Sequence, residues 1–279
     1  MISGKTQLLA LIGQPVSHSL SPAMHNAAVA EDGLDFVYVC LDVDPDDLAA
    51  AVKGAAALKL RGFNITMPHK RAMVSLVDEL DDGARISRAV NTVVIDGPRL
   101  RGFNTDGGGM VLACREAGIE LSGRRVLLVG AGGAAAAVAV AFGEAGVGEL
   151  YITNRSVEHA TQLRDNLRVA EIAKVEVHPL GVLDEVIPRA DIVVNATSLG
   201  MRDDDPLPIP IENLAEGVAV CDAVYRPGVE TSLARLARER GARVVTGDRM
   251  LLYQGALAQQ LWTGREPNVE AMSHAISSQ

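Results

Sequence analysis

The stretch "RRVLLVGAGGAAAAVAVAFGEAG" (Arg124–Gly146) decides the fold class of this chain. It consists of an apolar segment of strand length, a turn that contains three glycines, and an alanine-rich segment of helix length. Gly130 allows a tight turn, and the small residues that follow allow a helix to pack closely on a sheet. This order of strand, glycine turn and helix predicts the start of a Rossmann-type, doubly wound parallel sheet.

The rest of the chain beyond Ser122 repeats this alternation of apolar strands and helical segments. Continuous apolar strands between helices are typical of a parallel sheet that is covered on both faces. We therefore expect strands in six segments, at 124–130, 149–154, 174–179, 191–197, 218–224 and 242–247.

The first hundred residues show a less regular alternation of the same kind. We expect strands at 8–13, 36–43, 61–66 and 91–96, and helices at 21–33, 45–58 and 68–80. Ser21 is expected to be the N-cap of the first helix, with Pro22 at the first helical position. Because 279 residues are long for one domain, we expect an α/β chain of two domains, an N-terminal α/β domain and a Rossmann-type domain.

Composition narrows the classes of function. The chain has 26 Lys and Arg against 35 Asp and Glu, and no block of positive residues that would predict a nucleic-acid partner. The three cysteines and six histidines lack the spacing of a metal site or a disulfide framework, so we expect no metal and small, buried cysteines. No apolar run of membrane length and no signal-peptide pattern is present, which favours a cytoplasmic protein without a membrane partner.

The glycine turn also predicts a dinucleotide site. Gly132 and Gly133 let the backbone approach a pyrophosphate, and the N-terminus of the following helix offers N–H donors. A glycine turn without a ligand is the alternative, which the strand before it and the helix after it disfavour. The next strand ends in "NRS" (Asn154–Ser156), with Arg155 where NAD sites usually have an acid. Arg155 is suited to a 2′-phosphate, so NADP is expected unless this arginine is only a solvated loop residue.

At this point the chain resembles the shikimate dehydrogenase family over nearly its whole length. The segments that carry the resemblance occur in the family's order: "GQPVSHSLSPAMHN" (13–26), "GFNITMPHK" (62–70), "AVNTVV" (89–94), "GFNTDGGG" (102–109), "GAGGAAAA" (130–137), "NRS" (154–156), "NATSLGM" (195–201), "CDAVYRP" (221–227) and "GDRMLLYQGALAQ" (247–259).

The resemblance implies NADP-dependent reduction of 3-dehydroshikimate to shikimate, in the shikimate pathway of aromatic amino acid biosynthesis. It implies that Lys70 and Asp106 are the catalytic pair and that two serines bind the substrate carboxylate. The substrate-binding residues that it implies are Ser19, Ser21, Thr66, Lys70, Asn91, Asp106, Tyr225 and Gln254. The cofactor-binding residues that it implies are Gly130, Ala131, Gly132, Gly133, Ala134, Asn154, Arg155, Ser156, Thr197, Met201 and Gly247.

The chemistry of these residue types agrees with the implied roles. Reducing a ketone requires a proton donor at the developing alkoxide, and Lys70 can give that proton or hold the alkoxide as a fixed charge. Neutral amides such as Asn91 and Gln254 suit the recognition of hydroxyl groups. Asn64 and Asn104, in two matching "GFN" phrases, are expected to hold loop backbones together.

The family architecture implies a substrate domain at 1–106, joined by the C-terminal segment 248–279, and an NADP domain at 107–247. His159 stands where the family commonly has a second arginine, so the preference for NADP is expected to be weaker than usual. Arg249 also departs from the family, which commonly has glycine there.

Two other functions remain open at this stage. One is a quinate/shikimate dehydrogenase that uses NAD, and the other is a dehydrogenase-like binding protein without turnover. The presence of Lys70, Asp106 and Gln254 together disfavours the second. A homodimer is compatible with the sequence.

Overall fold

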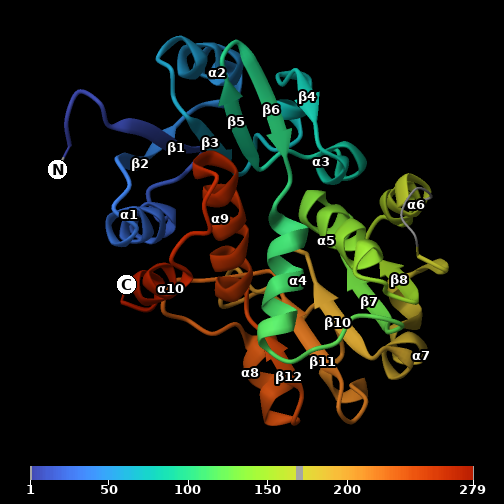
Figure 1. Cartoon of the computed structure of the whole chain (residues 1–279). Coiled ribbons are helices and arrows are strands. Elements are labelled where there is room, and N and C mark those ends of the chain that lie inside the picture. Colours follow the sequence, from blue (N-terminus) through green and yellow to red (C-terminus); the bar gives the residue numbers. More distant parts are fainter. Residues whose placement is uncertain (1, 168–171, 279) are drawn as a thin grey trace. The chain divides into compact units, whose positions relative to one another are not determined.

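The computed structural model describes residues 2–167 and 172–278 of the chain. The chain divides into two compact units, which we call unit 1 (Met1–Thr105 and Leu252–Gln279) and unit 2 (Asp106–Leu251). It passes between them twice, at 105–106 and inside helix α9 (Gly247–Thr263) (Figure 1).

Unit 2 is built on a six-stranded sheet in the order β12-β11-β10-β7-β8-β9, in which all neighbouring strands are parallel. The strands are β7 (Arg125–Val129), β8 (Glu149–Thr153), β9 (Lys174–His178), β10 (Ile192–Asn195), β11 (Ala219–Asp222) and β12 (Arg243–Val245). Each lies within a segment expected to be a strand, so the prediction of a Rossmann-type doubly wound sheet is confirmed. Strand order reverses between β7 and β10, and ligands of such sheets bind at the carboxyl ends of the strands there.

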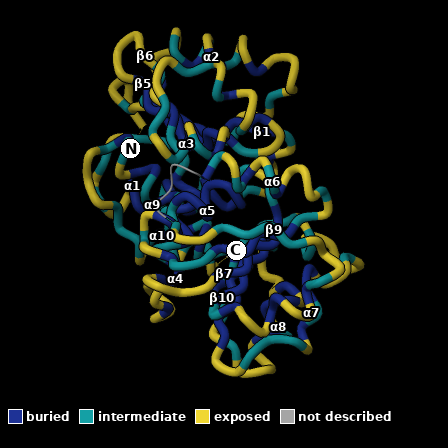
Figure 2. The backbone as a smooth tube through the Cα atoms, turned by 90° about the vertical axis from the view of Figure 1, so that its right-hand side faces the viewer, coloured by how far each residue is buried: buried dark blue, intermediate teal, exposed yellow. Residues whose placement is uncertain are grey.

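Of the helices that lie wholly within unit 2, the first precedes β7 and the others lie between consecutive strands. They are α4 (Asp106–Glu116), α5 (Gly133–Glu144), α6 (Val157–Asn166), α7 (Leu183–Val186) and α8 (Ser232–Glu239), with 3-10 turns at Leu180–Val182, Ile187–Arg189 and Ile211–Asn213. Both β7 and β10 are buried along most of their length (Figure 2).

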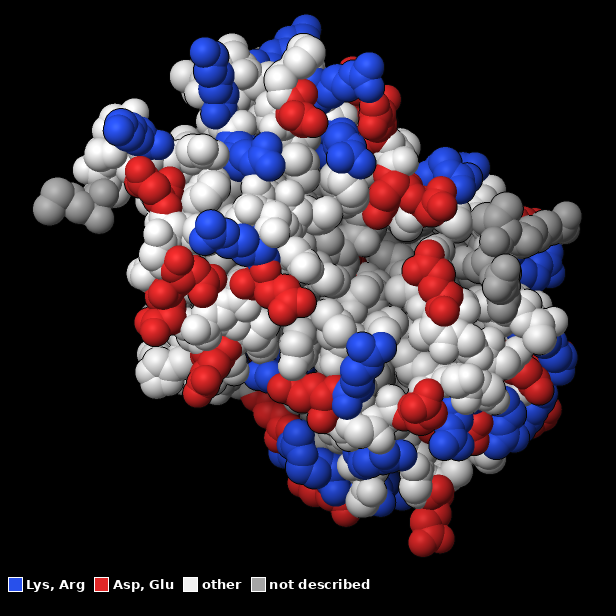
Figure 3. Space-filling model, viewed as in Figure 1, with Lys and Arg blue, Asp and Glu red and all other residues white. Residues whose placement is uncertain are grey.

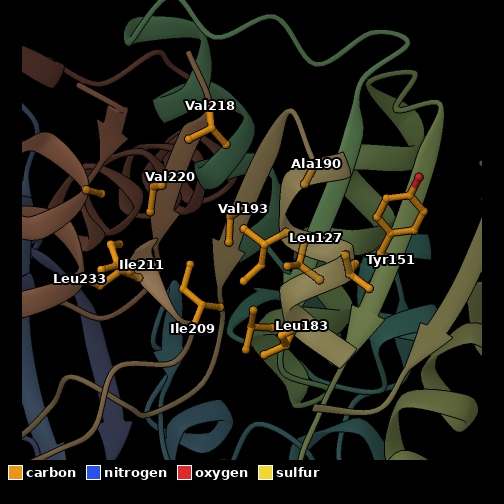
Figure 4. Close-up of a cluster of buried hydrophobic side chains, with 14 residues drawn as sticks. Leu127, Tyr151, Leu183, Ala190, Val193, Ile209, Ile211, Val218, Val220 and Leu233 are labelled. Carbon is orange, nitrogen blue, oxygen red and sulfur yellow. The ribbon is translucent and has the colours of Figure 1, made fainter. Parts of the chain in front are cut away.

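The core on one face of this sheet is aliphatic apart from Tyr151 (Figure 4). Leu127, Val193 and Val220 come from three adjacent strands and pack against Leu183 and Leu233 of the covering helices (Figure 4). The low aromatic content of 3% is therefore compatible with a core filled by Val, Leu, Ile and Ala.

Unit 1 contains a mixed six-stranded sheet in the order β2-β1-β3-β5-β6-β4. The strands are β1 (Gln7–Gly13), β2 (Phe36–Asp42), β3 (Gly62–Ile65), β4 (Glu79–Leu80), β5 (Thr92–Asp96) and β6 (Arg99–Phe103). β1 is parallel to β2 and β3, whereas β5 is antiparallel to β3 and β6. The four expected strands are confirmed, but β6 was missed because two of the five residues of its sequence, RLRGF, are charged, and the two-residue β4 lies inside an expected helix.

The helices that cover this sheet come from both the N-terminal and the C-terminal parts of the chain. The helices and 3-10 turns of unit 1 are α1 (Ser21–Glu31), Pro45–Asp47, α2 (Leu48–Ala57), Ala72–Ser75, α3 (Asp82–Ser87) and α10 (Val269–Ser277), with the part of α9 from Leu252 onwards. α1 packs against α10, and the Trp262 indole in α9 donates a hydrogen bond to Val93 O (2.9 Å). The C-terminal segment is thus part of the core of unit 1.

Two expectations about helices in unit 1 were wrong. The expected helix at 68–80 is only a 3-10 turn (Ala72–Ser75), because Asp78 N and Asp81 N donate to Leu100 O and Gly102 O and draw the segment beside β6. Ser21 is the first residue of α1 and not its N-cap, since Leu20 already has a helical backbone.

Cys114 and Cys221 are buried as expected, whereas Cys40 is only half buried. Lys and Arg side chains alternate with Asp and Glu over the face drawn in Figure 3. Within the described ranges, no helix is both long and apolar enough to cross a membrane.

Candidate functional site

The glycine turn of unit 2 has the geometry that the sequence predicts. Gly130 follows β7 with φ +119°, and a Cβ there would lie 2.8 Å from Ala196 O, so only glycine fits. Gly132 has extended backbone and nothing within 4 Å of its Cβ position, and α5 begins at Gly133. The turn therefore presents backbone N–H groups beside open space, which suits a pyrophosphate.

The segment after β8 contains an acid that the sequence analysis did not consider. Ser156 caps α6 by accepting from His159 N (3.3 Å), and its hydroxyl donates to Glu158 Oε2 (2.8 Å). This hydrogen bond is the main reason why the pKa of Glu158 is lowered. Arg155 and His159 are exposed beside it. A carboxylate thus lies five residues after the end of β8, close in sequence to the residues expected to hold a 2′-phosphate.

The loop after β10 is held by its own side chains. Asn195 Oδ1 accepts from Thr197 N (3.1 Å) and Thr197 Oγ1 (2.7 Å), and Asn195 Nδ2 donates to Leu199 O (3.1 Å). Ala196 approaches the glycine turn, as the contact with Gly130 shows. Met201 lies further along this loop, with 43% of its surface exposed.

Tyr225 and Gly247 lie next to each other at the carboxyl edge of the same sheet. A Cβ at Gly247 would lie 2.3 Å from Val224 O and 2.8 Å from Tyr225 N, so glycine lets α9 begin against this loop. The Tyr225 side chain is half buried. The expected cofactor residues from the glycine turn, the β10 loop and the start of α9 are therefore brought to one edge of the sheet.

Ser19 and Ser21 lie at the N-terminus of α1 in unit 1. Ser21 N donates to Ser19 Oγ (3.2 Å), and Ser21 is buried while Ser19 is half buried. Tyr38 and Cys40, on one face of β2, interact with them: Ser21 lowers the pKa of the Tyr38 phenol, and Ser19 lowers the pKa of the Cys40 thiol. Burial outweighs these effects and raises both pKa values, so both groups stay neutral near pH 7.

Lys70 lies in a turn that follows β3. Val90 N donates to Lys70 O (2.8 Å), which fixes the Lys70 backbone beside the start of β5. Thr66 is half buried in the same turn, and its carbonyl accepts from His69 N (3.0 Å). Asp106 is buried at the start of α4, and it is the first residue of unit 2, whereas Lys70 belongs to unit 1.

Asn91 is the centre of a buried hydrogen-bond network. Its Oδ1 accepts from Thr105 N (2.8 Å) and Thr92 Oγ1 (3.0 Å), and its Nδ2 donates to Thr105 Oγ1 (2.9 Å) and Gln254 Oε1 (3.3 Å). These donors fix which end of the amide is the oxygen. The structure therefore brings Asn91 and Gln254 together although 163 residues separate them.

Asn64 extends this network. Its amide donates to Asn91 O (3.1 Å) and Thr92 Oγ1 (3.0 Å), and its oxygen accepts from Tyr38 OH (2.8 Å). Asn104 Nδ2 likewise donates to Ala89 O (2.9 Å), so the expectation that both "GFN" asparagines hold loop backbones is confirmed. The sequence analysis did not identify Tyr38 as part of this network. The only sequence feature that points to Tyr38 is its place in a strand whose side chains alternate between the two faces of the sheet.

Comparison with known proteins gives one consistent result. Three family models match in order: the shikimate dehydrogenase substrate binding domain at residues 11–93, shikimate/quinate 5-dehydrogenase at 111–201 and the shikimate 5′-dehydrogenase C-terminal domain at 249–276. The NADP(+) shikimate dehydrogenase of Rubrobacter xylanophilus is 59% identical over 100% of this chain and 98% of its own length.

Solved structures agree with these sequence matches. The shikimate 5-dehydrogenase of Thermus thermophilus, in complex with NADP(H) and shikimate, is 38% identical with a TM-score of 0.88, covering 98% of this chain and 99% of its own. The quinate dehydrogenase of Corynebacterium glutamicum, in complex with NAD, is 35% identical with a TM-score of 0.90, covering 98% and 99%.

Proposed function

The chain belongs to the shikimate dehydrogenase family, and we propose from this that it catalyses the reversible, NADP-dependent reduction of 3-dehydroshikimate to shikimate. The observation that carries the proposal is the full-length likeness to an NADP(+) shikimate dehydrogenase at 59% identity. The reaction belongs to the shikimate pathway of aromatic amino acid biosynthesis.

In this proposal unit 2 binds the cofactor. NADPH, when bound, supplies the hydride that reduces the ketone. The residue set fits a dinucleotide, because the Gly130–Gly133 turn offers backbone donors beside open space and Arg155 is exposed at the end of β8. The full proposed set is Gly130, Ala131, Gly132, Gly133, Ala134, Asn154, Arg155, Ser156, Thr197, Met201 and Gly247.

Unit 1 binds the substrate in the same proposal. Ser19 and Ser21 hold the carboxylate with their hydroxyls at the start of α1, where the helix dipole also favours a negative group. The network fixes the orientation of the Asn91 amide, and a ring oxygen of the substrate takes the place of Gln254 Oε1 as the acceptor from Asn91 Nδ2. Thr66, Gln254 and the unit 2 residue Tyr225 complete the set.

Lys70 and Asp106 are the proposed catalytic pair. Lys70 gives a proton to the developing alkoxide, or holds it as a fixed positive charge, and Asp106 orients Lys70 and a substrate hydroxyl. The backbone hydrogen bond from Val90 to Lys70 supports a defined position for the lysine.

A steady-state assay with four combinations, shikimate or quinate with NADP⁺ or NAD⁺, tests the function. We expect the highest kcat/KM for shikimate with NADP⁺. Turnover of quinate with NAD⁺ as the best pair would favour the alternative NAD-dependent enzyme, and no turnover of any pair by folded protein would favour a binding protein. A homodimer and a cytoplasmic location stay predictions, which light scattering after size exclusion and cell fractionation would check.

A further inference from the structure

Asp222 is a buried carboxylate to which the sequence analysis assigned no role. It ends β11 with 1% of its surface exposed. Its Oδ2 accepts from Thr231 Oγ1 (2.6 Å), and its Oδ1 accepts from Asn195 Nδ2 (2.9 Å) and Val224 N (3.1 Å). Burial raises the pKa of Asp222, and these three hydrogen bonds oppose that rise. Burying a carboxylate away from water costs free energy, and the hydrogen bonds from the three donors offset part of that cost.

The first donor connects Asp222 to the loop after β10. Because Asn195 Nδ2 faces the carboxylate, Asn195 Oδ1 must face the other way, where it accepts from Thr197 N and Thr197 Oγ1. The Thr197 hydroxyl then accepts from Leu199 N (3.1 Å). The conformation of residues 195–199 thus depends on the orientation of one amide, which Asp222 sets together with Leu199 O and Thr197 N.

The other two donors connect Asp222 to the segment between β11 and α8. Val224 N fixes the backbone directly before Tyr225, and Thr231 is the N-cap of α8, where its hydroxyl also accepts from Ala234 N (3.2 Å). One carboxylate therefore holds two separate loops at the carboxyl edge of the sheet.

Both loops contact the backbone of proposed cofactor residues. Ala196 O lies 2.8 Å from the Cβ position of Gly130, and Val224 O lies 2.3 Å from that of Gly247. A shift of either loop would therefore change the shape of the glycine turn's surroundings or of the start of α9. All of these contacts lie within unit 2.

We propose that Asp222 is a positioning residue for dinucleotide binding, which acts by orienting Asn195 and thereby the loop that carries Thr197 and Met201. The proposal rests on the proposed function, because it assumes that this edge of the sheet binds NADPH. A carboxylate suits the role because it only accepts hydrogen bonds and can serve three donors, whereas alanine would leave all three without this acceptor.

Asp191 supplies a matched control. It precedes β10 at the opposite, amino edge of the sheet, and it accepts from Arg125 N (2.9 Å) and from the Arg125 guanidinium (2.7 Å). Both aspartates bind neighbouring strands together, but only Asp222 lies at the edge where doubly wound sheets bind ligands. A merely stabilising role predicts the same result for the two positions.

The test is isothermal titration of NADPH into wild type, Asp222→Ala, Asn195→Ala and Asp191→Ala, with kcat and KM for each cofactor-saturated enzyme. We expect the Kd for NADPH to rise about tenfold or more in the first two variants, as a lost supporting contact does in a preorganised site. We expect less than a twofold change in Asp191→Ala, and a kcat at saturating NADPH within about threefold of wild type in all three.

Asn195→Ala decides the question if Asp222→Ala does not fold, because it retains the carboxylate and cuts only the connection to the loop. Wild-type Kd values in a folded Asp222→Ala or Asn195→Ala, with only a lower Tm, would overturn the proposal. Equal losses of affinity in Asp222→Ala and Asp191→Ala would overturn it as well. Wild type that binds no NADPH would instead contradict the proposed function.

Discussion

The two units of this chain place their proposed binding residues in different ways. In unit 2 they lie on loops at one edge of a parallel sheet, and much of the expected recognition comes from backbone N–H groups at the Gly130–Gly133 turn. In unit 1 the central residue Asn91 lies inside a side-chain network with Thr92, Thr105, Asn64 and Gln254.

This difference teaches which property each unit controls. A site made of backbone groups depends on the shape of its loops. Substitutions that change this shape are therefore expected to change the affinity for the cofactor. A site made of oriented amides and hydroxyls loses a specific hydrogen bond with each substitution, so changes there alter substrate recognition or the reaction itself.

The largest effect is expected at Lys70. Lys70→Ala should lower kcat about 100-fold or more, since that is the usual contribution of a positioned acid or base. The Kd for NADPH should stay near the wild-type value, because Lys70 belongs to unit 1. Lys53→Ala, at an exposed position of α2, is the control and should change neither value. Near-normal kcat in folded Lys70→Ala would exclude the assigned role.

The next effect is expected at Ser19 and Ser21. Alanine at either should raise KM for shikimate roughly 10- to 100-fold, because a hydrogen bond to a charged group contributes about 1.5–3 kcal/mol. The KM for NADP⁺ should not change. Ser17→Ala, at an exposed neighbouring position, controls for local disturbance of the loop. An unchanged KM for shikimate in both single variants would place the carboxylate elsewhere.

His25 should make unit 1 sensitive to acid. It is fully buried, stacks on Tyr38 at 4.3 Å between ring centroids, and hydrogen-bonds Gln259 Oε1 (2.9 Å). Burial lowers its pKa from 6.5 to about 4. The unfolded chain therefore binds a proton below pH 6.5 that the folded chain binds only near pH 4, so folding is weakened as pH falls through this window.

We expect the free energy of unfolding to decrease by about 2 kcal/mol between pH 7 and pH 5 from this residue. Urea titration followed by the fluorescence of Trp262, the only tryptophan, reports on unit 1, since the indole lies 5.5 Å from the His25 ring. In His25→Phe the pH dependence in this range should be reduced by that amount. The same pH dependence in the variant and in wild type would refute this prediction.

The smallest effect is expected in cofactor choice. Glu158 adds a negative charge beside Arg155 and His159, where the 2′-phosphate of NADP is proposed to bind. Glu158→Gln should raise the ratio of the NADP⁺ and NAD⁺ values of kcat/KM several-fold, because exposed charges interact weakly. Arg155→Asp should shift the ratio towards NAD⁺. Glu185→Gln, an acidic position on α7, should leave the ratio unchanged.

A change in KM for shikimate in Glu158→Gln would break the division between the two units. If the ratio of the NADP⁺ and NAD⁺ values of kcat/KM stays at the wild-type value in both Glu158→Gln and Arg155→Asp, the segment after β8 does not bind the 2′-phosphate.

The sequence predicted most of unit 2 because its signals are local. Most strands from β7 to β12 contain a short apolar run, β9 (KVEVH) alternates polar and apolar residues, and the turn at Gly130 requires a positive φ that glycine adopts freely. In unit 1 the same reasoning failed for residues 68–80, whose apolar spacing resembles a helix. Hydrogen bonds to β6, which are distant in sequence, outweighed that local preference.

By itself the sequence determined the fold class, the family and the residue types available for chemistry, since these follow from periodicity, turn residues and motif order. Only the tertiary structure decided how those residues are oriented. Asn91 meets Gln254, Tyr38 meets Asn64, and Asp222 meets Asn195 across separations of 163, 26 and 27 residues. Spacing along the chain carries no information about such pairs, because the direction of a buried amide is set by donors that folding brings together.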